Sequence, residues 1–326
     1  MAKISLGKGI NMGLRAAMEK DPKVVIMGED IGKLGGVFRV TEGLQKDFGE
    51  DRVIDTPLAE SGIIGTAVGL ALRGYRPVCE IQFDGFVFPA YDQIINQVAK
   101  MHYRSMGKLK MPIVIRIPFG GGIGAVEHHS ESPETLFAHV AGQKVVACGD
   151  PVDAYWMIQQ AIASDDPIVF FEPKRRYHEK AELSEDMVSA PFPLHKAKVV
   201  REGTDATLFC YGPMVKTCLQ AAEAAVEDGR NLEVVDLRTI APLDLATIFE
   251  SVKKTRRAVV VHEAPLSLGT GSELAARVTE ECFYHLEAPV LRVAGFDTPD
   301  PPSRMEEEYL PDLDRVLDGV DRVMEY

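Results

Sequence analysis

The stretch Asp55-Thr-Pro-Leu-Ala-Glu-Ser-Gly-Ile-Ile-Gly65 holds a buried-looking carboxylate, Glu60, where an extended entry meets a run of small and apolar residues. Residues 61–73 are rich in Ile, Val, Leu and Ala, and Gly74 follows them. This pattern predicts a buried helix with Glu60 at its N-terminal edge. Glu60 then either serves the helix alone, because acids are favourable in a first turn, or faces a ligand.

The ligand interpretation has a specific chemical form. Thiamine diphosphate needs a carboxylic acid beside its aminopyrimidine ring nitrogen before its thiazolium ring can lose a proton. A single carboxylate at a helix start, next to apolar residues, could supply that hydrogen bond. On the local pattern by itself the first-turn interpretation is favoured, so the rest of the chain has to decide.

Short Val- and Ile-rich runs alternate with helical patterns along the chain, which is typical of doubly wound, mostly parallel sheets. The expected strands of the first half are residues 23–27, 53–55, 77–83, 113–118, 144–147 and 168–172, and its helices are residues 7–19, 61–73, 87–103 and 151–164. The expected strands of the second half are residues 206–211, 232–237, 258–262 and 290–293, and its helices are residues 215–227, 243–252, 272–285 and 312–323.

The segment between the two halves breaks this rhythm. Residues 177–195 are polar and acidic and contain two prolines, without a strong period. We therefore expect two doubly wound α/β domains, at residues 1–176 and 196–326, joined by a linker over residues 177–195.

Composition limits the partners and the compartment. The 326 residues are 46% hydrophobic and 26% charged, which is ordinary for a globular chain. The net charge of -13 argues against nucleic acid and anionic membrane surfaces as partners. Three short basic runs, at residues 174–176, 253–254 and 256–257, are interpreted as solvated or subunit-facing charge.

Five widely spaced cysteines without a C-x-x-C pattern indicate small core residues in a reducing compartment and no zinc site. The first residues lack the apolar run of a secretory signal, and no run is long enough to span a membrane. We expect a cytoplasmic protein.

No glycine-rich stretch forms a convincing phosphate cradle. Gly120-Gly-Gly-Ile-Gly124 follows a strand, but no helix opens on it. Gly269-Thr-Gly271 opens a helix but is too short for a Walker loop, and residues 227–231 fit a helix C-cap turn better than a Mg-diphosphate motif.

Polar residues gather in three further places. Glu29 ends the first strand, within Met27-Gly-Glu-Asp30. Gln82 lies near the end of the expected strand 77–83 and Phe86 follows it, and the carboxyl ends of strands are where ligands bind in open α/β sheets. His128 and His129 follow the Gly120 run. They are open to three interpretations: an exposed polar loop, an incomplete metal site, or a mobile lip of an active site whose imidazole moves protons.

Taken together, these segments resemble the beta subunits of thiamine-diphosphate-dependent 2-oxoacid dehydrogenases, nearly from end to end. Each motif is weak alone, but the ordered set is specific. The motifs are Met27-Gly-Glu-Asp30, Asp55-Thr-Pro-Leu-Ala-Glu60, Glu80-Ile-Gln-Phe83, Phe88-Pro-Ala-Tyr-Asp-Gln-Ile94, His129-Ser130, Phe171-Glu-Pro-Lys174, Asp236-Leu-Arg-Thr-Ile240, Pro242-Leu-Asp244, and Arg292-Val293 with Gly295, Asp297 and Pro299.

The resemblance implies a pyrimidine-binding domain followed by a transketolase C-terminal-like domain. It also implies that Glu60 protonates the aminopyrimidine nitrogen and that Leu58, Gln82 and Phe86 help to bind the cofactor. His129 would serve acyl transfer to the lipoyl group. The branched-chain branch of the family usually shows His-Ser-Gln where this chain has His129-Ser130-Glu131, which bears on the hydrogen bonding around His129.

Two further roles follow from the same resemblance. Glu29 would belong to an acidic tunnel that joins paired active sites. A structural monovalent cation such as K⁺ would lie near Ile113, Ala161, Ile162 and Asp166, held largely by backbone oxygens.

The resemblance also implies partners. An alpha subunit would bring the Mg²⁺-diphosphate site, so this chain is half of an active site in an α2β2 heterotetramer. The lipoyl domain and core of a dihydrolipoyl acyltransferase would receive the acyl group. The motifs favour a branched-chain 2-oxoacid as substrate, then pyruvate, then acetoin. The rival interpretations are a self-contained transketolase-like enzyme, against which the length argues, and a non-catalytic partner subunit.

Overall fold

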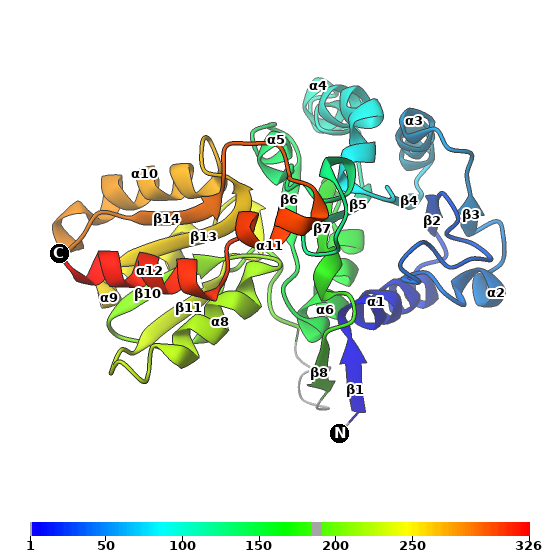
Figure 1. The fold of residues 1–326 in the computed structure, drawn as a ribbon. Helices are drawn as coiled ribbons and strands as arrows, with labels where there is room; N and C mark the ends of the chain where they lie inside the picture. The colour runs from blue at the N-terminus through cyan, green and yellow to red at the C-terminus, as the bar shows by residue number, and fades with distance from the viewer. Residues whose placement is uncertain (1, 184–190) are drawn as a thin grey trace.

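The computed structural model describes residues 2–183 and 191–326. They form two α/β halves that lie side by side, each built around its own sheet (Figure 1). The N-terminal half contains a seven-stranded sheet and the C-terminal half a five-stranded sheet. Residues 184–190, part of the expected linker, lie outside the described residues.

The larger sheet has the order β12-β6-β7-β5-β4-β2-β3. Its strands are parallel except for β12, which runs antiparallel to β6. The strands are β2 (Val24–Gly28), β3 (Val53–Asp55), β4 (Arg76–Glu80), β5 (Val114–Phe119), β6 (Lys144–Ala147), β7 (Ile168–Pro173) and β12 (Thr239–Ala241). The central strands are buried along their whole length, as apolar runs in a doubly covered sheet predict.

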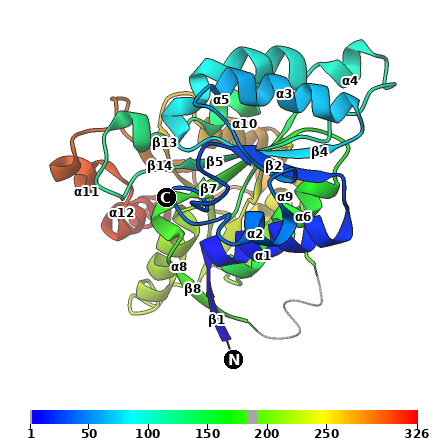
Figure 2. The same cartoon turned by 90° about the vertical axis from the view of Figure 1, so that its right-hand side faces the viewer.

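Helices cover both faces of this sheet (Figures 1 and 2). On one face α1 (Leu6–Lys20) packs against α6 (Pro151–Ala163). Their close approach depends on Gly9, where a Cβ would lie 2.2 Å from the carbonyl oxygen of Pro151. The other face carries α3 (Glu60–Leu72) and the segment that follows β4.

The smaller sheet has the order β14-β13-β10-β11-β9, and only its edge strand β9 is antiparallel. Helices α9 and α10 pack together, and so do α8 and α12. The elements are β9 (Lys198–Arg201), β10 (Ala206–Cys210), α8 (Met214–Ala224), β11 (Leu232–Asp236), α9 (Leu245–Thr255), β13 (Ala258–Pro265), α10 (Thr270–Cys282), β14 (Leu291–Gly295), α11 (Glu306–Tyr309) and α12 (Leu313–Met324).

The two halves share one hydrophobic core. Strand β12 comes from the C-terminal half but completes the larger sheet. The buried side chains of Phe119, Phe171, Phe209 and Tyr211 belong to one cluster that crosses the junction. Arg238, fully buried, binds Asp153 of α6 through both carboxylate oxygens, at 2.5 and 2.8 Å. These contacts hold the two halves as one body.

The structure corrects the prediction of one regular helix over residues 87–103. The segment is a 3-10 helix (Asp84–Ala90), a π-helical stretch (Gln93–Val98) and a short α-helix, α4 (Met101–Arg104). Pro89 lies inside the first of these and cannot donate a backbone hydrogen bond, which explains the tighter opening turn.

Part of the expected linker is also ordered. Residues Lys180–Leu183 form β8, which pairs antiparallel with β1 (Ala2–Ser5). A polar strand whose partner lies about 180 residues away leaves no local pattern from which to predict it. Two other short helices lie between predicted elements: α2 (Leu44–Phe48) and α5 (Glu134–Ala138).

Candidate active site

The predicted cofactor-binding residues come together at one edge of the larger sheet. Strands β3, β2 and β4 are neighbours and parallel, so their carboxyl ends meet there. Glu29 follows β2, Glu60 begins α3 after β3, and Gln82 follows β4. This is the edge where open α/β sheets bind ligands.

Two carboxylates face each other at this edge. Glu60 is 8% exposed and Glu29 is 7% exposed. Burial raises the pKa of Glu29, and the nearby Glu60 and Asp30 carboxylates raise it further. Oε1 of Glu29 is buried without a hydrogen-bond partner, and within the described part of the chain no group donates to Glu60. Buried carboxylates left unpaired are costly, so this pair fits a site completed by a ligand.

Apolar side chains flank the carboxylates. Leu58, just before α3, is 79% exposed, which is unusual for a large aliphatic side chain and fits a surface covered by a ligand or a partner chain. Phe86 is half-buried. Gln82 donates weakly to Asp30 at 3.4 Å, so its amide is largely free for another acceptor.

His129 lies beside this edge and is held by aromatic rings. Its ring centroid is 4.4 Å from that of Phe83 and 5.2 Å from that of Phe86, both edge-on. Burial lowers the pKa of His129, and the charges of Lys174 and His128 lower it further. The imidazole is therefore mainly neutral near pH 7, the form in which it can accept a proton.

A close backbone contact places this histidine. His129 ends a short 3-10 turn (Glu127–His129) that packs on the segment after β4. A Cβ on Gly85 would lie 2.6 Å from the carbonyl oxygen of His128, so only glycine lets the two backbones approach this closely. The sequence predicted the residue but offered no signal for this contact.

One basic residue differs from its prediction. Lys174 was expected to be solvated, yet its side chain is fully buried in an ion pair with Asp84. Its Nζ also lies 5.6 Å from the centre of the Phe83 ring. Asp84 accepts a further hydrogen bond from the backbone of Glu131 at 2.9 Å. The Lys174–Asp84 ion pair therefore lies next to the Phe83 ring. Sequence reasoning missed this pair because its two residues are 90 positions apart.

A second set of buried, paired charges lies close to the same edge of the sheet. Arg116 on β5 binds Glu80 of β4 at 2.6 Å and both carboxylate oxygens of Glu172 on β7, at 2.6 and 2.9 Å. Tyr177 donates to Glu172 at 2.6 Å. These strands are neighbours in the sheet, so one guanidinium ties three of them together. Neither Arg116 nor its carboxylates were singled out from the sequence.

The residues at this edge offer groups that an aromatic nitrogen heterocycle could contact. They are the unpaired Glu60 carboxylate, the apolar Leu58 and Phe86, and the Gln82 amide, which makes only one weak hydrogen bond. Among residues 2–183 and 191–326, no group of three His, Cys, Asp or Glu side chains could hold a metal ion.

The four residues predicted near a monovalent cation lie around the end of α6 and the start of β5. The backbone oxygens of Ile113, Ala161 and Ile162 already accept hydrogen bonds. The carbonyl of Ile162 accepts from Arg76 at 3.0 Å, and that of Ile113 accepts from the backbone of Ile168 at 2.9 Å. The Asp166 carboxylate pairs with Lys144 at 2.9 Å. A carbonyl has two lone pairs, so one remains for a cation.

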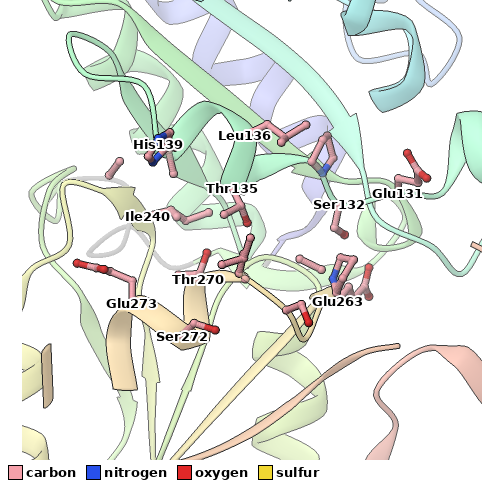
Figure 3. A pocket seen from close by; sticks show the side chains of 18 of the residues that line it. Glu131, Ser132, Thr135, Leu136, His139, Ile240, Glu263, Thr270, Ser272 and Glu273 are labelled. Atoms are coloured by element: carbon pink, nitrogen blue, oxygen red, sulfur yellow. The ribbon is translucent and has the colours of Figure 1, made fainter. Parts of the chain in front are cut away.

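A large cleft lies elsewhere, between the two halves of the chain. It encloses about 1200 Å³ and does not include Glu29, Leu58 or Glu60 in its wall. Figure 3 shows Ser132, Thr135 and Leu136 on one side of it and Thr270 and Ser272 on the other. The cofactor edge is an open surface in a single chain, whereas this cleft is closed by both halves. Volume alone is therefore a poor guide to the chemistry here.

Asp300, at 6% exposure, lines this cleft with both carboxylate oxygens unpartnered. Burial raises the pKa of Asp300 to about 7, and Glu306 and Glu263 add to the rise. The folded chain thus favours the neutral acid. The stability that Asp300 contributes falls as the pH rises from its ordinary pKa through about 7.

We therefore expect Asp300→Asn to stabilise the protein more at pH 8 than at pH 6. The gain in Tm relative to the unsubstituted chain should be larger at pH 8 by about 2 °C or more, measured by differential scanning fluorimetry. Asp228→Asn, at an exposed turn, is the control and should show no such trend. An equal gain at both pH values would refute the assignment.

Comparisons with known proteins agree with the observed fold. The family model of the transketolase pyrimidine-binding domain matches residues 2–180, and that of the transketolase C-terminal domain matches residues 195–316. A split-gene transketolase, described as an inactive beta4 tetramer, has the same fold, with a TM-score of 0.82 over 99% of this chain and 98% of its own at 22% identity.

Two relatives with higher sequence identity are named as beta subunits of 2-oxoacid dehydrogenases. The pyruvate dehydrogenase E1 component subunit beta of Leifsonia xyli is 62% identical, covering 98% of this chain and 94% of its own. The 3-methyl-2-oxobutanoate dehydrogenase subunit beta of Mycobacterium tuberculosis is 53% identical, covering 98% and 92%. The chain belongs to the family of 2-oxoacid dehydrogenase beta subunits, enzymes that depend on thiamine diphosphate.

Proposed function

We propose that this chain, paired with an alpha subunit, catalyses the oxidative decarboxylation of a 2-oxoacid and passes the acyl group to a lipoyl domain. The observation that carries the proposal is the buried Glu60 carboxylate, which has no donor in the described chain and lies at the ligand-binding edge of the sheet. Bound thiamine diphosphate supplies the electron sink for loss of carbon dioxide. Glu60 holds a proton at the aminopyrimidine nitrogen by a charge-assisted hydrogen bond.

The other residues of this edge have supporting roles. Leu58 and Phe86 exclude water from the face of the pyrimidine ring, and Gln82 adds a polar contact at its rim. The pKa of Glu29 is raised by burial and by the nearby Glu60 carboxylate, and Glu29 fits an acidic path between paired sites. His129, neutral and beside Phe86, is placed to move a proton during acyl transfer.

We propose an α2β2 heterotetramer in which the alpha subunit brings the Mg²⁺ and diphosphate site. The exposed Leu58 supports this, and so do the glycine-rich stretches of the sequence, none of which forms a convincing phosphate cradle. The acyl acceptor is the lipoyl domain carried by the core of a dihydrolipoyl acyltransferase. A monovalent cation, K⁺ for instance, near Ile113, Ala161, Ile162 and Asp166 belongs to the same proposal, since their carbonyls keep a free lone pair.

We also propose the division into a pyrimidine-binding domain (1–176), a linker (177–195) and a C-terminal domain (196–326). The two matched family segments support it. A cytoplasmic location is proposed on the five free, buried cysteines. Within the described residues, none of the helices is both long and apolar enough to cross a membrane.

The substrate is proposed as a branched-chain 2-oxoacid, on the motifs around residues 80–83 and 171–174 and the relative named for 3-methyl-2-oxobutanoate. Pyruvate is the second candidate, because the 62% identical relative is named for it. Ferricyanide-coupled decarboxylation by the alpha–beta pair, on 2-oxoisovalerate, pyruvate and 2-oxobutyrate, decides between them. Activity of this chain without an alpha subunit would overturn the half-site proposal.

Replacing His129 by alanine is expected to harm acyl transfer more than decarboxylation. Without the imidazole, acylation of a lipoylated domain should fall by about 10²-fold or more, because general acid–base groups contribute factors of this order. Decarboxylation coupled to ferricyanide should change much less. The neighbouring exposed His128→Ala is the matched control. Equal losses in both assays would remove this role from His129.

A further inference from the structure

A hydrogen bond joins the two ends of the glycine-rich loop that leads to His129. The loop leaves β5 at Gly120, and the backbone N–H of Gly120 donates to the carbonyl oxygen of Glu131 at 3.0 Å. Residues 120–131 thus form a compact loop with joined ends, and His129 lies near its exit. Gly120, Gly122 and Gly124 have φ values of +83°, +91° and +73°, which other residues adopt only with strain.

The tip of this loop is held by a carboxylate from the other half of the chain. Glu306, the first residue of α11, accepts from the backbone N–H of Gly122 through Oε1 at 2.7 Å and from that of Gly124 through Oε2 at 2.8 Å. Its side chain is 5% exposed. Both carboxylate oxygens are therefore used to orient two backbone amides of the loop.

A second carboxylate fixes the base of the same loop. Glu263 at β13 accepts from the N–H of Gly121 at 3.1 Å and lies 2.5 Å from a guanidinium nitrogen of Arg175. A Cβ on Gly122 would lie 2.5 Å from Cδ of Arg175, and one on Gly121 would lie 2.9 Å from Cδ2 of Leu310. The loop is thus fitted tightly against the C-terminal half.

From this geometry we propose that Glu306 is a positioning residue for His129. It acts through the loop, so the C-terminal half sets the place of the imidazole without touching a substrate. The inference rests on the proposed function, because it assigns Glu306 to the acyl-transfer step that His129 serves. Glu60 lies on a separate element, α3, which packs against β4 and the segment that follows it.

The test compares two reactions of the alpha–beta pair. With Glu306→Ala, two loop amides lose their acceptor and the imidazole is less well placed. Acylation of the lipoylated domain of its acyltransferase should fall by about tenfold or more in kcat/KM, because small misplacements of catalytic groups have effects of this size or larger. Ferricyanide-coupled decarboxylation should stay within about threefold of the unsubstituted enzyme, since a group that does not act in that step leaves its barrier unchanged.

Glu306→Gln is the conservative variant and retains one acceptor oxygen, so its acylation should lie between the two. Glu307→Ala and Glu308→Ala, at exposed neighbouring positions, are the controls. Hydrogen exchange of the amides of residues 121–125 should quicken in Glu306→Ala while Tm stays constant. If Glu306→Ala is less stable as a whole, the Gln variant carries the test.

The outcomes separate the two proposals. If the unsubstituted pair neither decarboxylates a 2-oxoacid nor acylates a lipoyl domain, the proposed function fails. If it does both, equal losses of the two reactions in Glu306→Gln, or no loss in either reaction, would overturn the positioning role. A selective loss of acylation together with faster exchange of the loop amides would establish it.

Discussion

Replacing Glu60 by glutamine in the assembled enzyme is expected to lower decarboxylation by roughly 10²–10⁴-fold, the range that general acid–base groups contribute. Glutamine has nearly the same size, so packing at the start of α3 should persist. It cannot carry a negative charge, however, and a charge-assisted hydrogen bond to the aminopyrimidine nitrogen is about twice as strong as a neutral one. The loss should therefore appear in turnover with every 2-oxoacid that the enzyme accepts.

The measurement is ferricyanide-coupled decarboxylation by the alpha–beta pair at saturating thiamine diphosphate. Circular dichroism and Tm should match the unsubstituted pair, which would separate chemistry from folding. Glu50→Gln, at an exposed turn before β3, is the control and should retain full activity. Near-normal turnover by Glu60→Gln would show that Glu60 serves only the first turn of its helix.

The second large effect is expected at Arg116. Arg116→Met removes the guanidinium and leaves Glu80 and Glu172 buried without their partner. Burial already raises the pKa of Glu80, and Arg116 counters that effect. Breaking a buried ion pair on one side costs about 3–5 kcal/mol, because it strands a charge in the interior. The urea midpoint should fall accordingly.

Two comparisons sharpen this test. Arg277→Met breaks an exposed pair with Glu273 within α10 and should leave the urea midpoint almost unchanged, because water screens exposed ion pairs. The triple variant Arg116→Met, Glu80→Gln, Glu172→Gln removes the stranded charges and should recover part of the loss. A loss for Arg116→Met no larger than that for Arg277→Met would contradict the account.

Local patterns predicted most of the elements. The strands at residues 53–55 and 144–147 appear with those bounds, and helices α1, α3 and α6 begin and end within one residue of the expected positions. Apolar periodicity is strong there because each element buries one or both faces. The expectation failed at residues 87–103, where helical composition coexists with Pro89 and the local backbone hydrogen-bond pattern changes along the segment.

Some residues of the candidate site could be placed from the sequence, and others only from the structure. Glu29, Glu60 and Gln82 could be predicted because each follows a strand, and parallel strands bring their carboxyl ends to one edge. Lys174 could not, since a basic run on its own indicates solvated charge. Its burial depends on Asp84, which the fold brings from another strand end. The resemblance to a known family found His129, whereas the rings that hold it became visible only in the structure.

The sequence by itself determined the two α/β halves and the carboxylate at the start of α3, because these depend on periodicity and on residues near one another in the chain. Only the tertiary structure decided that Arg116 joins three strands, that β12 completes the sheet of the other half, and that Glu306 holds the loop of His129. These contacts join residues between about 36 and 184 positions apart, and no local pattern encodes which distant partner a buried charge or amide will meet.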